Sequence, residues 1–379
     1  MEHLFFLWYN ILEVNMEKVR IAHLADFHLG GEIHENNELS KKINVNLIKG
    51  LLEIFNMLNL AKVDLVLIAG DFYESSSLDK NLHNEIKKIF SNFSGKIIIA
   101  PGNHDYISLD SPYMEEWPDN TYIFKNQKIE YFEFKNLNTR VYGFAFNQSH
   151  IKSPMLSNFP VIDEKYINLG VFHGQMDEMM NSYNPIFIED IKNTNLDYIA
   201  LGHIHKRSEI KKVSNTYYAY SGNPVGRGFN ETGIKGIYLG DISKNRNGLN
   251  FYKLNNSEFH TINFEIDSFI DQKDLAEQIK VYLFNKFGEK YKKNYYRINL
   301  NGYIEENNFI NIDMITHYLS EIEYIELKDN TKIKIVFNQI SYENNLKGIF
   351  VQKVLNSTLD ENDKKTIIDI GIKALEDIL

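Results

Sequence analysis

The stretch KIIIAPGNHD, residues 96–105, decides the fold of this chain. Its first half is a run of apolar, mostly β-branched residues, which is typical of a strand buried on both faces. Gly102 then predicts a turn, and residues 103–105 follow it with an amide, an imidazole and a carboxylate. Because ligands of open α/β sheets gather at the carboxyl ends of strands, this turn is a candidate functional site.

Polar signatures follow apolar runs in the same way at four other points of the chain. They are Asp26-Phe27-His28, Gly70-Asp71, His173-Gly174 and Gly202-His203-Ile204-His205. The five signatures together supply carboxylate, amide and imidazole ligands but no thiolate. Such a set suits two divalent cations and therefore phosphate-ester hydrolysis. Turn chemistry explains any one signature alone, but not all five in order at predicted strand ends.

The composition bounds the compartment and the partners. The 379 residues include no cysteine, so the chain has no disulfide framework and fits a reducing cytoplasm. The formal net charge of −10 disfavours long-range attraction to nucleic acid. It does not exclude nucleic-acid binding, because a local basic patch and bound cations set the field where a phosphate lies.

The first 16 residues contain a short apolar cluster that calls for an explanation. No Lys or Arg precedes it, no small-residue cleavage site follows it, and it is too short to cross a bilayer. We therefore expect residues 1–16 to be a dispensable N-terminal extension rather than a signal or an anchor. No other segment is apolar for long enough to span a membrane, so no membrane association is expected.

The remaining chain divides by the rhythm of its predicted elements. Strands and long helices alternate up to residue 100, and shorter strands with few helices follow, including a turn over residues 243–248. This change predicts a mixed, two-sheet α/β sandwich over residues 17–255. Residues 256–345 then read as a small α+β capping domain, and residues 346–379 as two helices.

The five signatures resemble those of the calcineurin-like metallophosphoesterase superfamily, which are D-x-H, G-D, G-N-H-[DE], H and G-H-x-H. Leu29-Gly30, directly after the first signature, resembles the SbcD-type DNA repair nuclease subunits within that superfamily. The run YSGNPVGRGFNETGIKG, residues 220–236, is similar to the YhaO-like subgroup. The superfamily resemblance covers residues 19–254 and implies a hydrolase that acts on phosphate esters.

The resemblance also implies a role for each site residue. One cation would be held by Asp26, His28, Asp71 and His205, and the other by Asp71, Asn103, His173 and His203, with Asp71 bridging. Both cations are expected to be manganese, lowering the pKa of a water molecule so that hydroxide attacks phosphorus. His104 matches a non-ligand histidine that protonates the leaving oxygen or stabilises the pentavalent state, and Asp105 would orient its neighbours.

Some basic and acidic residues near the signatures leave alternatives open. Repair nucleases of this kind often carry a histidine three residues after the bridging Asp, whereas this chain has Glu74. That departure leaves the efficiency and polarity of exonuclease action open, without affecting the metal ligands. Arg227 is either a phosphate contact or an ion-pair partner of Glu231 or another acid. Lys206 and Arg207 are either backbone-phosphate contacts or a solvated turn.

The leading hypothesis is a manganese-dependent DNA nuclease whose capping domain shapes access to DNA ends. The resemblance further implies a homodimer that works with a coiled-coil ATPase of the SbcC or YhaN kind. Residues 346–379 would then dock that partner, or else pack on their own chain. The alternatives are a small-molecule phosphodiesterase or phosphatase and, less favoured because the ligand set and His104 are intact, a scaffold without turnover.

Overall fold

The computed structural model describes residues 17–31, 37–75, 79–176, 182–254, 257–305, 308–333, 340–342 and 344–376. The expected N-terminal extension, residues 1–16, lies outside the described residues. The chain forms two compact units. The first unit comprises the chain up to residue 260 with residues 293–295, and the second comprises residues 261–292 and 296–379.

The first sheet of the first unit is built around a parallel centre. Its strands are β1 (Lys18–Leu24), β2 (Leu65–Ile68), β3 (Lys96–Ile99), β4 (Thr121–Ile123), β13 (Gly236–Ser243) and β14 (Arg246–Lys253). Their order across the sheet is β14-β13-β1-β2-β3-β4. The strands from β1 to β4 pair in parallel, so their carboxyl ends meet at one edge, and β13 and β14 add an antiparallel hairpin beside β1.

The second sheet also has six strands and a parallel centre. Its strands are β5 (Glu130–Phe134), β6 (Thr139–Gly143), β7 (Ile167–His173), β10 (Tyr198–Gly202), β11 (Lys211–Val213) and β12 (Thr216–Tyr220). Their order is β11-β12-β10-β7-β6-β5, with β6, β7, β10 and β12 parallel. The predicted two-sheet mixed α/β sandwich is therefore confirmed.

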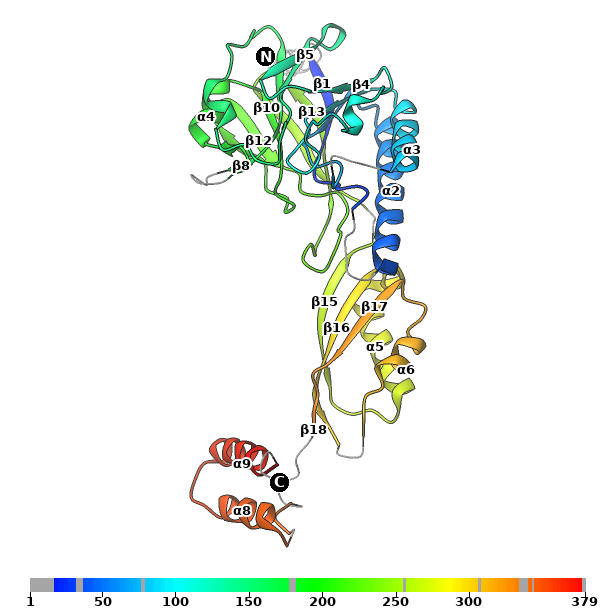
Figure 1. Cartoon of the computed structure of the whole chain (residues 1–379), viewed down its shortest axis with the longest axis vertical. Coiled ribbons are helices and arrows are strands. Elements are labelled where there is room, and N and C mark those ends of the chain that lie inside the picture. Colours follow the sequence, from blue (N-terminus) through cyan, green and yellow to red (C-terminus); the bar gives the residue numbers. More distant parts are fainter. Residues whose placement is uncertain are drawn as a thin grey trace, which may run out of the picture. The chain divides into compact units, whose positions relative to one another are not determined.

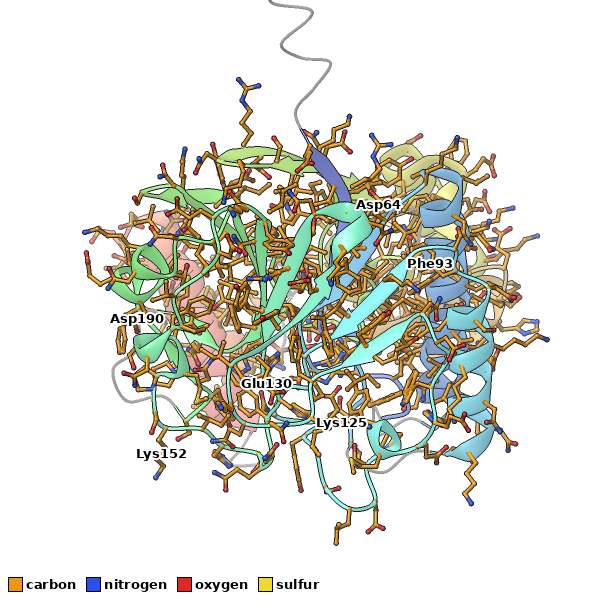
Figure 2. The ribbon with its side chains drawn as sticks, turned by 90° about the horizontal axis from the view of Figure 1, so that it is seen from above. Asp64, Phe93, Lys125, Glu130, Lys152 and Asp190 are labelled. Carbon is orange, nitrogen blue, oxygen red and sulfur yellow. The ribbon has the colours of Figure 1, made fainter. Side chains whose placement is uncertain are left out.

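Helices lie outside the sheets of this unit. They are α2 (Asn37–Leu60), α3 (Lys80–Ser91) and α4 (Ile188–Thr194). The short strands β8 (Gln175–Met176) and β9 (Pro185–Ile186) pair with each other in parallel. Figure 1 shows α2 and α3 on one side of the sandwich and α4 on the other. The view from above agrees, since Phe93 after α3 and Asp190 on α4 lie at opposite sides of it (Figure 2).

The main hydrophobic core fills the space between the two sheets. It joins residues of β1, β2 and β3, such as Ile21, Leu67 and Ile98, to residues of the other sheet, such as Leu169 and Ala200. Continuous apolar runs on these strands are what burial on both faces requires.

One polar side chain, His23 of β1, is buried inside this unit. Its Nδ1 lies 2.9 Å from the Tyr198 hydroxyl and its Nε2 lies 3.1 Å from the Leu201 carbonyl oxygen, so both nitrogens have partners. Burial lowers the pKa of His23 to about 3, and the imidazole therefore stays neutral inside the sandwich.

The turn expected over residues 243–248 is shorter than the sequence suggests. Strand β13 continues to Ser243, β14 starts at Arg246, and these two residues pair across the hairpin. Only two residues form the turn, with Asn245 in the left-handed region at φ 56°. Asparagine tolerates that conformation. The polar residues after it belong to the exposed start of β14 rather than to a loop.

The second unit contains a sheet covered by helices. Its elements are β15 (Phe259–Ile266), α5 (Gln272–Phe287), β16 (Tyr295–Ile304), α6 (Ile312–Tyr318), β17 (Tyr324–Asp329) and β18 (Lys332–Ile333). The strand order is β15-β16-β17, with β18 paired to β16. Helices α5 and α6 lie on one face of this sheet (Figure 1), where apolar residues of helices and strands form a second core.

A helical hairpin closes the described chain. It consists of α8 (Leu346–Leu355) and α9 (Glu361–Glu376), which share a small core of Val351, Ile368 and Ile372. The polar run at residues 360–363 starts the second helix, because the Asp360 carboxylate accepts the N–H groups of residues 362 and 363. None of the described helices has the length and apolarity needed to cross a lipid bilayer.

Candidate metal centre

The structure brings the predicted ligands together where strands of both sheets end. Asp26 follows β1, Asp71 follows β2, His173 ends β7 and His203 follows β10. Three groups of side chains have ligand atoms within 4.8 Å of one another. These groups are Asp26, His28 and His205; His28, Asp71 and His104; and Asp71, His173 and His203.

The first group has donor atoms placed to bind a single cation. His28 Nε2 and His205 Nε2 face each other at 3.1 Å, and a single cation can bind the lone pairs of both. Asp26 Oδ2 is buried and has no hydrogen-bond partner, whereas Oδ1 accepts the backbone N–H of His203. A buried carboxylate oxygen without a partner is costly, and a divalent cation would satisfy it.

Asp71 connects this group to a second set of donors. Its Oδ2 lies 3.7 Å from His28 Nε2 and 3.3 Å from His173 Nε2, which is the position that a bridging carboxylate needs. Asn103 Oδ1 completes the second set, because it lies 2.9 Å from His173 Nε2 and 3.2 Å from His203 Nδ1. All seven predicted ligands therefore converge on one place, where His203 and His205 are half-buried and the other five are buried.

The charges of these donors are strongly coupled. Burial and the opposing charge of His173 act in opposite directions on Asp71, and the imidazole prevails, so the pKa of Asp71 is lowered. Burial alone would lower the pKa of His173, but Asp71 raises it to about 9. His203, by contrast, has its pKa lowered to about 3 by burial and by neighbouring His173. Neutral imidazole and ionised carboxylate are the forms that bind a divalent cation.

The backbone at the ligands is held in an uncommon conformation. Asp26, His28, Asp71 and His203 have φ values of 56°, 52°, 48° and 103°. Non-glycine residues adopt this region at a cost, and such residues concentrate at functional sites. Main-chain hydrogen bonds from Asp26 to Gly70 (3.0 Å) and from His28 to Asp71 (2.9 Å) hold the strand ends against each other.

The glycines of the signatures are required by close packing. A Cβ atom at Gly202 would lie 1.8 Å from the Ala69 carbonyl oxygen, and one at Gly70 would lie 2.4 Å from His173 Nδ1. A Cβ atom at Gly102 would likewise lie 2.3 Å from Asp71 Oδ1. Gly70 and Gly202 thus let the two sheets approach closely, and Gly102 lets neighbouring strand ends of the first sheet do so.

Asp105 joins two of the signatures without facing the cations. Its carboxylate is buried and accepts the backbone N–H of Gly102 at 2.6 Å and that of Asp71 at 3.2 Å. It also accepts the backbone N–H groups of Phe72 and Tyr73. The Tyr113 hydroxyl donates to it at 2.6 Å. The structure therefore places Asp105 where it fixes the turns that carry Asp71 and Asn103.

His104 differs from the ligands in being accessible. Its side chain is 42% exposed, and its backbone N–H donates to Asp71 Oδ1 at 2.9 Å. His104 Nδ1 lies 3.4 Å from Glu74 Oε1, and this contact raises the pKa of His104. Glu74 Oε2 also lies 2.8 Å from His28 Nδ1. Glu74, which the sequence marked only as a departure from the family pattern, thus contacts both imidazoles.

A second carboxylate, Glu231, contacts another predicted ligand of the centre. Its Oε1 lies 2.7 Å from His205 Nδ1, and its Oε2 accepts the Asn223 amide at 2.7 Å. Burial would raise the pKa of Glu231, but His205 and Arg227 lower it to about 2. The sequence suggested Glu231 only as a partner of Arg227. The signal for its larger role was its place within residues 220–236.

Arg227 lies between the two carboxylates. Its guanidinium donates to Glu74 Oε2 at 2.7 Å and to Glu231 Oε1 at 3.2 Å. These are ion pairs with both acids, one of which was named as the structural alternative to a phosphate contact. The side chain of Arg227 is 15% exposed, so little of the guanidinium faces solvent.

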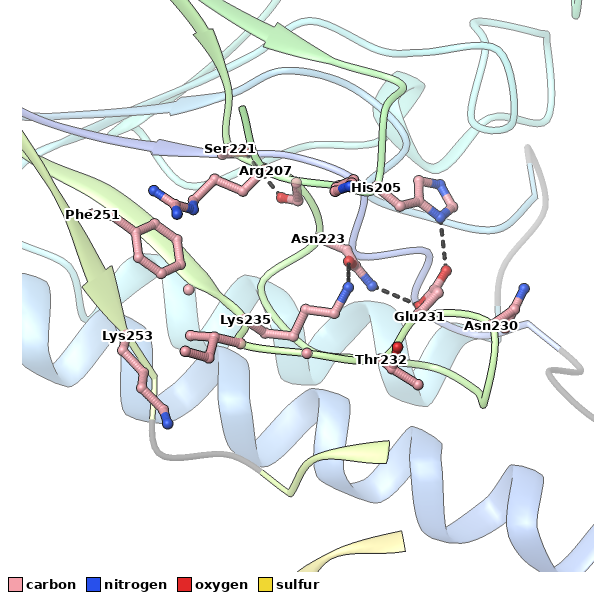
Figure 3. Close-up of a pocket in the computed structure, with 15 residues that line it drawn as sticks. His205, Arg207, Ser221, Asn223, Asn230, Glu231, Thr232, Lys235, Phe251 and Lys253 are labelled. Atoms are coloured by element: carbon pink, nitrogen blue, oxygen red, sulfur yellow. Dashed lines mark hydrogen bonds and ion pairs between the residues drawn. The ribbon is translucent and has the colours of Figure 1, made fainter. Parts of the chain in front are cut away.

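Lys206 and Arg207 line a pocket of about 660 Å³ beside His205 (Figure 3). The Arg207 guanidinium lies 4.3 Å from the centre of the Phe251 ring and pairs with Glu209 at 3.2 Å. The two basic residues that follow the last signature therefore face a cavity next to a predicted ligand.

The family to which this site belongs follows from a comparison of sequences. Residues 19–207 match the family model described as calcineurin-like phosphoesterase. The chain belongs to the calcineurin-like metallophosphoesterases, a family of phosphoesterase hydrolases that use divalent metals, and the matched residues include all seven convergent donors.

Two named relatives refine this placement. The chain is 27% identical to the uncharacterized metallophosphoesterase YhaO of Bacillus subtilis over 238 residues, which is 58% of each chain, so the match spans little more than half of that relative. It is 23% identical to the SbcD subunit of the nuclease SbcCD of Staphylococcus saprophyticus over 91% of this chain and 100% of the relative. Both similarities support the predicted SbcD- and YhaO-like subgroup.

Among solved structures, the chain resembles GAP50, titled the anchor in the inner membrane complex of Plasmodium. The likeness has 12% identity and a TM-score of 0.36, and it covers 63% of this chain and 89% of that chain.

Proposed function

We propose that this chain is a metal-dependent DNA nuclease that hydrolyses phosphodiester bonds. The observation that carries the proposal is the convergence of seven oxygen and nitrogen donors beside an accessible imidazole, His104. A phosphodiester is the substrate class because the relative matched over its whole length is named as a subunit of a nuclease. A residue set of this kind, with two linked groups of ligands, suits hydrolysis at phosphorus.

The roles of the residues follow from their positions. One cation would be held by Asp26, His28, Asp71 and His205, and the other by Asp71, Asn103, His173 and His203. When bound, the cations would lower the pKa of water and offset negative charge on the phosphate. The chain itself would orient the ester and supply the proton for the leaving oxygen.

His104 is the proton donor in this proposal. Its Nδ1 points at Glu74, so the proton available to a substrate is the one on Nε2. The carboxylate of Glu74 favours the protonated imidazole, which is the form that a general acid needs before it acts. Glu74 would then be a positioning residue for His104.

The remaining parts of the proposal concern the setting of the enzyme. We take manganese as the cation, the cytoplasm as the compartment and a homodimer as the working form. Residues 256–345 would cap the site and contact DNA. The helical hairpin at residues 346–379 would dock a coiled-coil ATPase of the SbcC or YhaN kind, in keeping with a relative whose name makes it one component of a complex.

The test is a nuclease assay on defined DNA ends with manganese and with magnesium. His104→Ala is expected to lower kcat about 10²- to 10⁴-fold with its metal content unchanged. Asp71→Asn is expected to lose both metal and activity. The exposed His317 and Asp119 provide matched controls as His317→Ala and Asp119→Asn.

Two outcomes would overturn the proposal. Unaltered turnover in His104→Ala would remove the assigned proton donor. Hydrolysis of bis(p-nitrophenyl) phosphate without any cleavage of DNA would instead favour the small-molecule phosphodiesterase or phosphatase.

A further inference from the structure

The pocket beside His205 is rich in positive charge. Among the described residues that line it, one carries a carboxylate, Glu231, and four are basic: Lys206, Arg207, Lys235 and Lys253. The whole chain has a formal net charge of −10, so this local excess opposes the overall balance. A concave basic surface in an acidic protein concentrates anions locally.

The basic residues differ in how firmly they are held. Among the described residues, Lys206 has no ion-pair partner, whereas Lys253 pairs with Glu258 at 3.2 Å. Lys235 is half-buried, and its Nζ donates to Asn223 Oδ1 at 2.6 Å, which leaves further N–H groups for an anion.

A chain of contacts connects the pocket to the metal centre. Lys235 donates to Asn223, Asn223 donates to Glu231, and Glu231 contacts His205 Nδ1, as the dashed lines in Figure 3 show. The pocket therefore starts at a predicted ligand and extends from it. Lys253 and Phe251 lie at the other side of the view from His205 (Figure 3).

One face of the Phe251 ring, the phenyl ring in the described lining, is already covered. Phe251 carries the Arg207 guanidinium over its ring at 4.3 Å, so that face is not free to stack on a nucleobase. Hydrogen-bond donors and charge, rather than ring faces, are what the pocket offers. Such a surface recognises the sugar-phosphate backbone and not the base sequence.

We propose that this pocket binds a backbone phosphate of a DNA strand next to the phosphodiester held at the metal centre. The inference rests on the proposed nuclease function and deepens it, since it assigns an extended strand rather than a small phosphate ester as the substrate. A small ester would occupy the metal centre alone and leave the basic pocket unused.

The test measures binding and turnover separately. A fluorescent single-stranded oligodeoxythymidylate is titrated with protein in a chelator, where no hydrolysis occurs, over a series of salt concentrations. The double variant Lys206→Ala/Lys253→Ala is expected to bind about tenfold more weakly. Its salt dependence should be shallower by about 0.7 in log–log slope for each phosphate that the variant no longer binds. Lys235→Gln provides a second, independent variant inside the pocket.

Controls separate the pocket from the rest of the chain. Lys128→Ala/Lys192→Ala removes two exposed lysines outside the pocket and should bind like the wild type. Hydrolysis of bis(p-nitrophenyl) phosphate with manganese should be unchanged in Lys206→Ala/Lys253→Ala, which would show that this variant folds and retains the centre. Lys235→Gln, whose contact chain reaches His205, is used for the binding measurement alone. Inorganic phosphate serves as a competitor of the oligonucleotide. It distinguishes a site for free phosphate from a site for a strand, because only binding of a strand should show a shallower salt dependence in the pocket variants.

The outcomes of the two proposals are distinguishable. Equal binding by wild type and both pocket variants, or no binding of the oligonucleotide by the wild type, would overturn the pocket proposal. Pocket-dependent binding without any cleavage of DNA would support the pocket and overturn the nuclease. If the wild type cleaves DNA and Lys206→Ala/Lys253→Ala cleaves it equally well, the nuclease proposal is supported and the pocket proposal is overturned.

Discussion

Glu74 shows how one residue can carry a function that its position in the sequence does not suggest. The structure places its carboxylate against His28, His104 and Arg227, at 2.8, 3.4 and 2.7 Å. Arg227 is separated from Glu74 by 153 residues. A local pattern predicts turns and strand ends, but it does not report a contact across that distance. The ligands were predictable because they lie at the ends of predicted strands, whereas the roles of Glu74 and Glu231 were not.

Glu231 provides a direct test of such support. Glu231→Gln removes the charge that orients His205. Substituting a carboxylate that orients a metal ligand typically lowers metal affinity about 10- to 100-fold. We therefore expect weaker binding of Mn²⁺ in calorimetric titrations. Glu209→Gln changes a carboxylate that pairs with Arg207 rather than with His205, and this variant should bind Mn²⁺ as the wild type does. Equal affinities of all three proteins would contradict the role given to Glu231.

His23 makes the stability of the fold depend on pH. Burial holds its pKa at about 3, below the ordinary value of 6.5, so between these values the unfolded chain binds a proton that the folded chain excludes. Stability is therefore lost as the pH falls from about 6.5 towards 3, at up to about 1.4 kcal/mol per pH unit for this group. Above pH 6.5 the residue contributes no pH dependence.

Urea unfolding at a series of pH values measures this contribution. As the pH falls, the free energy of unfolding of His23→Gln should decrease less steeply than that of the wild type. The slopes against pH should differ by the contribution of about one proton. His317→Gln, at an exposed position, should keep the slope of the wild type. Parallel curves for His23→Gln and the wild type would show that His23 does not titrate in this way.

At the scale of elements, the strand ends were the most predictable feature of the molecule. Buried apolar runs stop at Ala25, Ala69 and Ala100, and the polar signatures begin at the next residue or, after Ala100, one residue later. The β13–β14 hairpin was less predictable, because a polar run beginning at Ser243 suggested a longer loop than the two-residue turn that forms. Exposed strands of a hairpin tolerate polar residues, so composition alone does not locate their ends.

The meeting of β2 and β10 depends on one small residue. Gly202→Ala would place a methyl group 1.8 Å from the Ala69 carbonyl oxygen if nothing moved, so the strand ends must separate. We expect a loss of about 1–3 kcal/mol in the free energy of unfolding and weaker binding of Mn²⁺. Denaturant unfolding and metal titration measure the two effects.

Gly228→Ala is the matched control for this substitution. Its added Cβ would meet only the Asn230 side-chain oxygen, at 2.9 Å, and that side chain can move aside. Both stability and metal affinity should stay close to those of the wild type. If Gly202→Ala behaved like Gly228→Ala, the close approach of the two strand ends would not be needed for the site.

For the whole molecule, separate cores predict separate responses to metal. All seven donors lie in the first unit, while the second unit has its own core around α5 and β16. A ligand at a concentration 100 times its Kd stabilises the unit that binds it by about 2.7 kcal/mol. We therefore expect Mn²⁺ to raise only one of two transitions in scanning calorimetry.

Asp71→Asn should abolish that shift in Tm, whereas Asp119→Asn should retain it. A shift of both transitions by equal amounts would mean that the two units unfold together.

The total charge of −10 and the basic lining beside His205 show that a sum over the sequence does not describe a local surface.

The buried carboxylate of Asp105 has a consequence for how ions arrive. It gathers main-chain N–H groups from two separate loops and one phenol, all within the protein. Those amide protons should exchange slowly with deuterium even after chelation, since the junction owes nothing to the ions. The turns that carry Asp71 and Asn103 are thus held by the protein itself, and we expect ion binding to require no rearrangement of them.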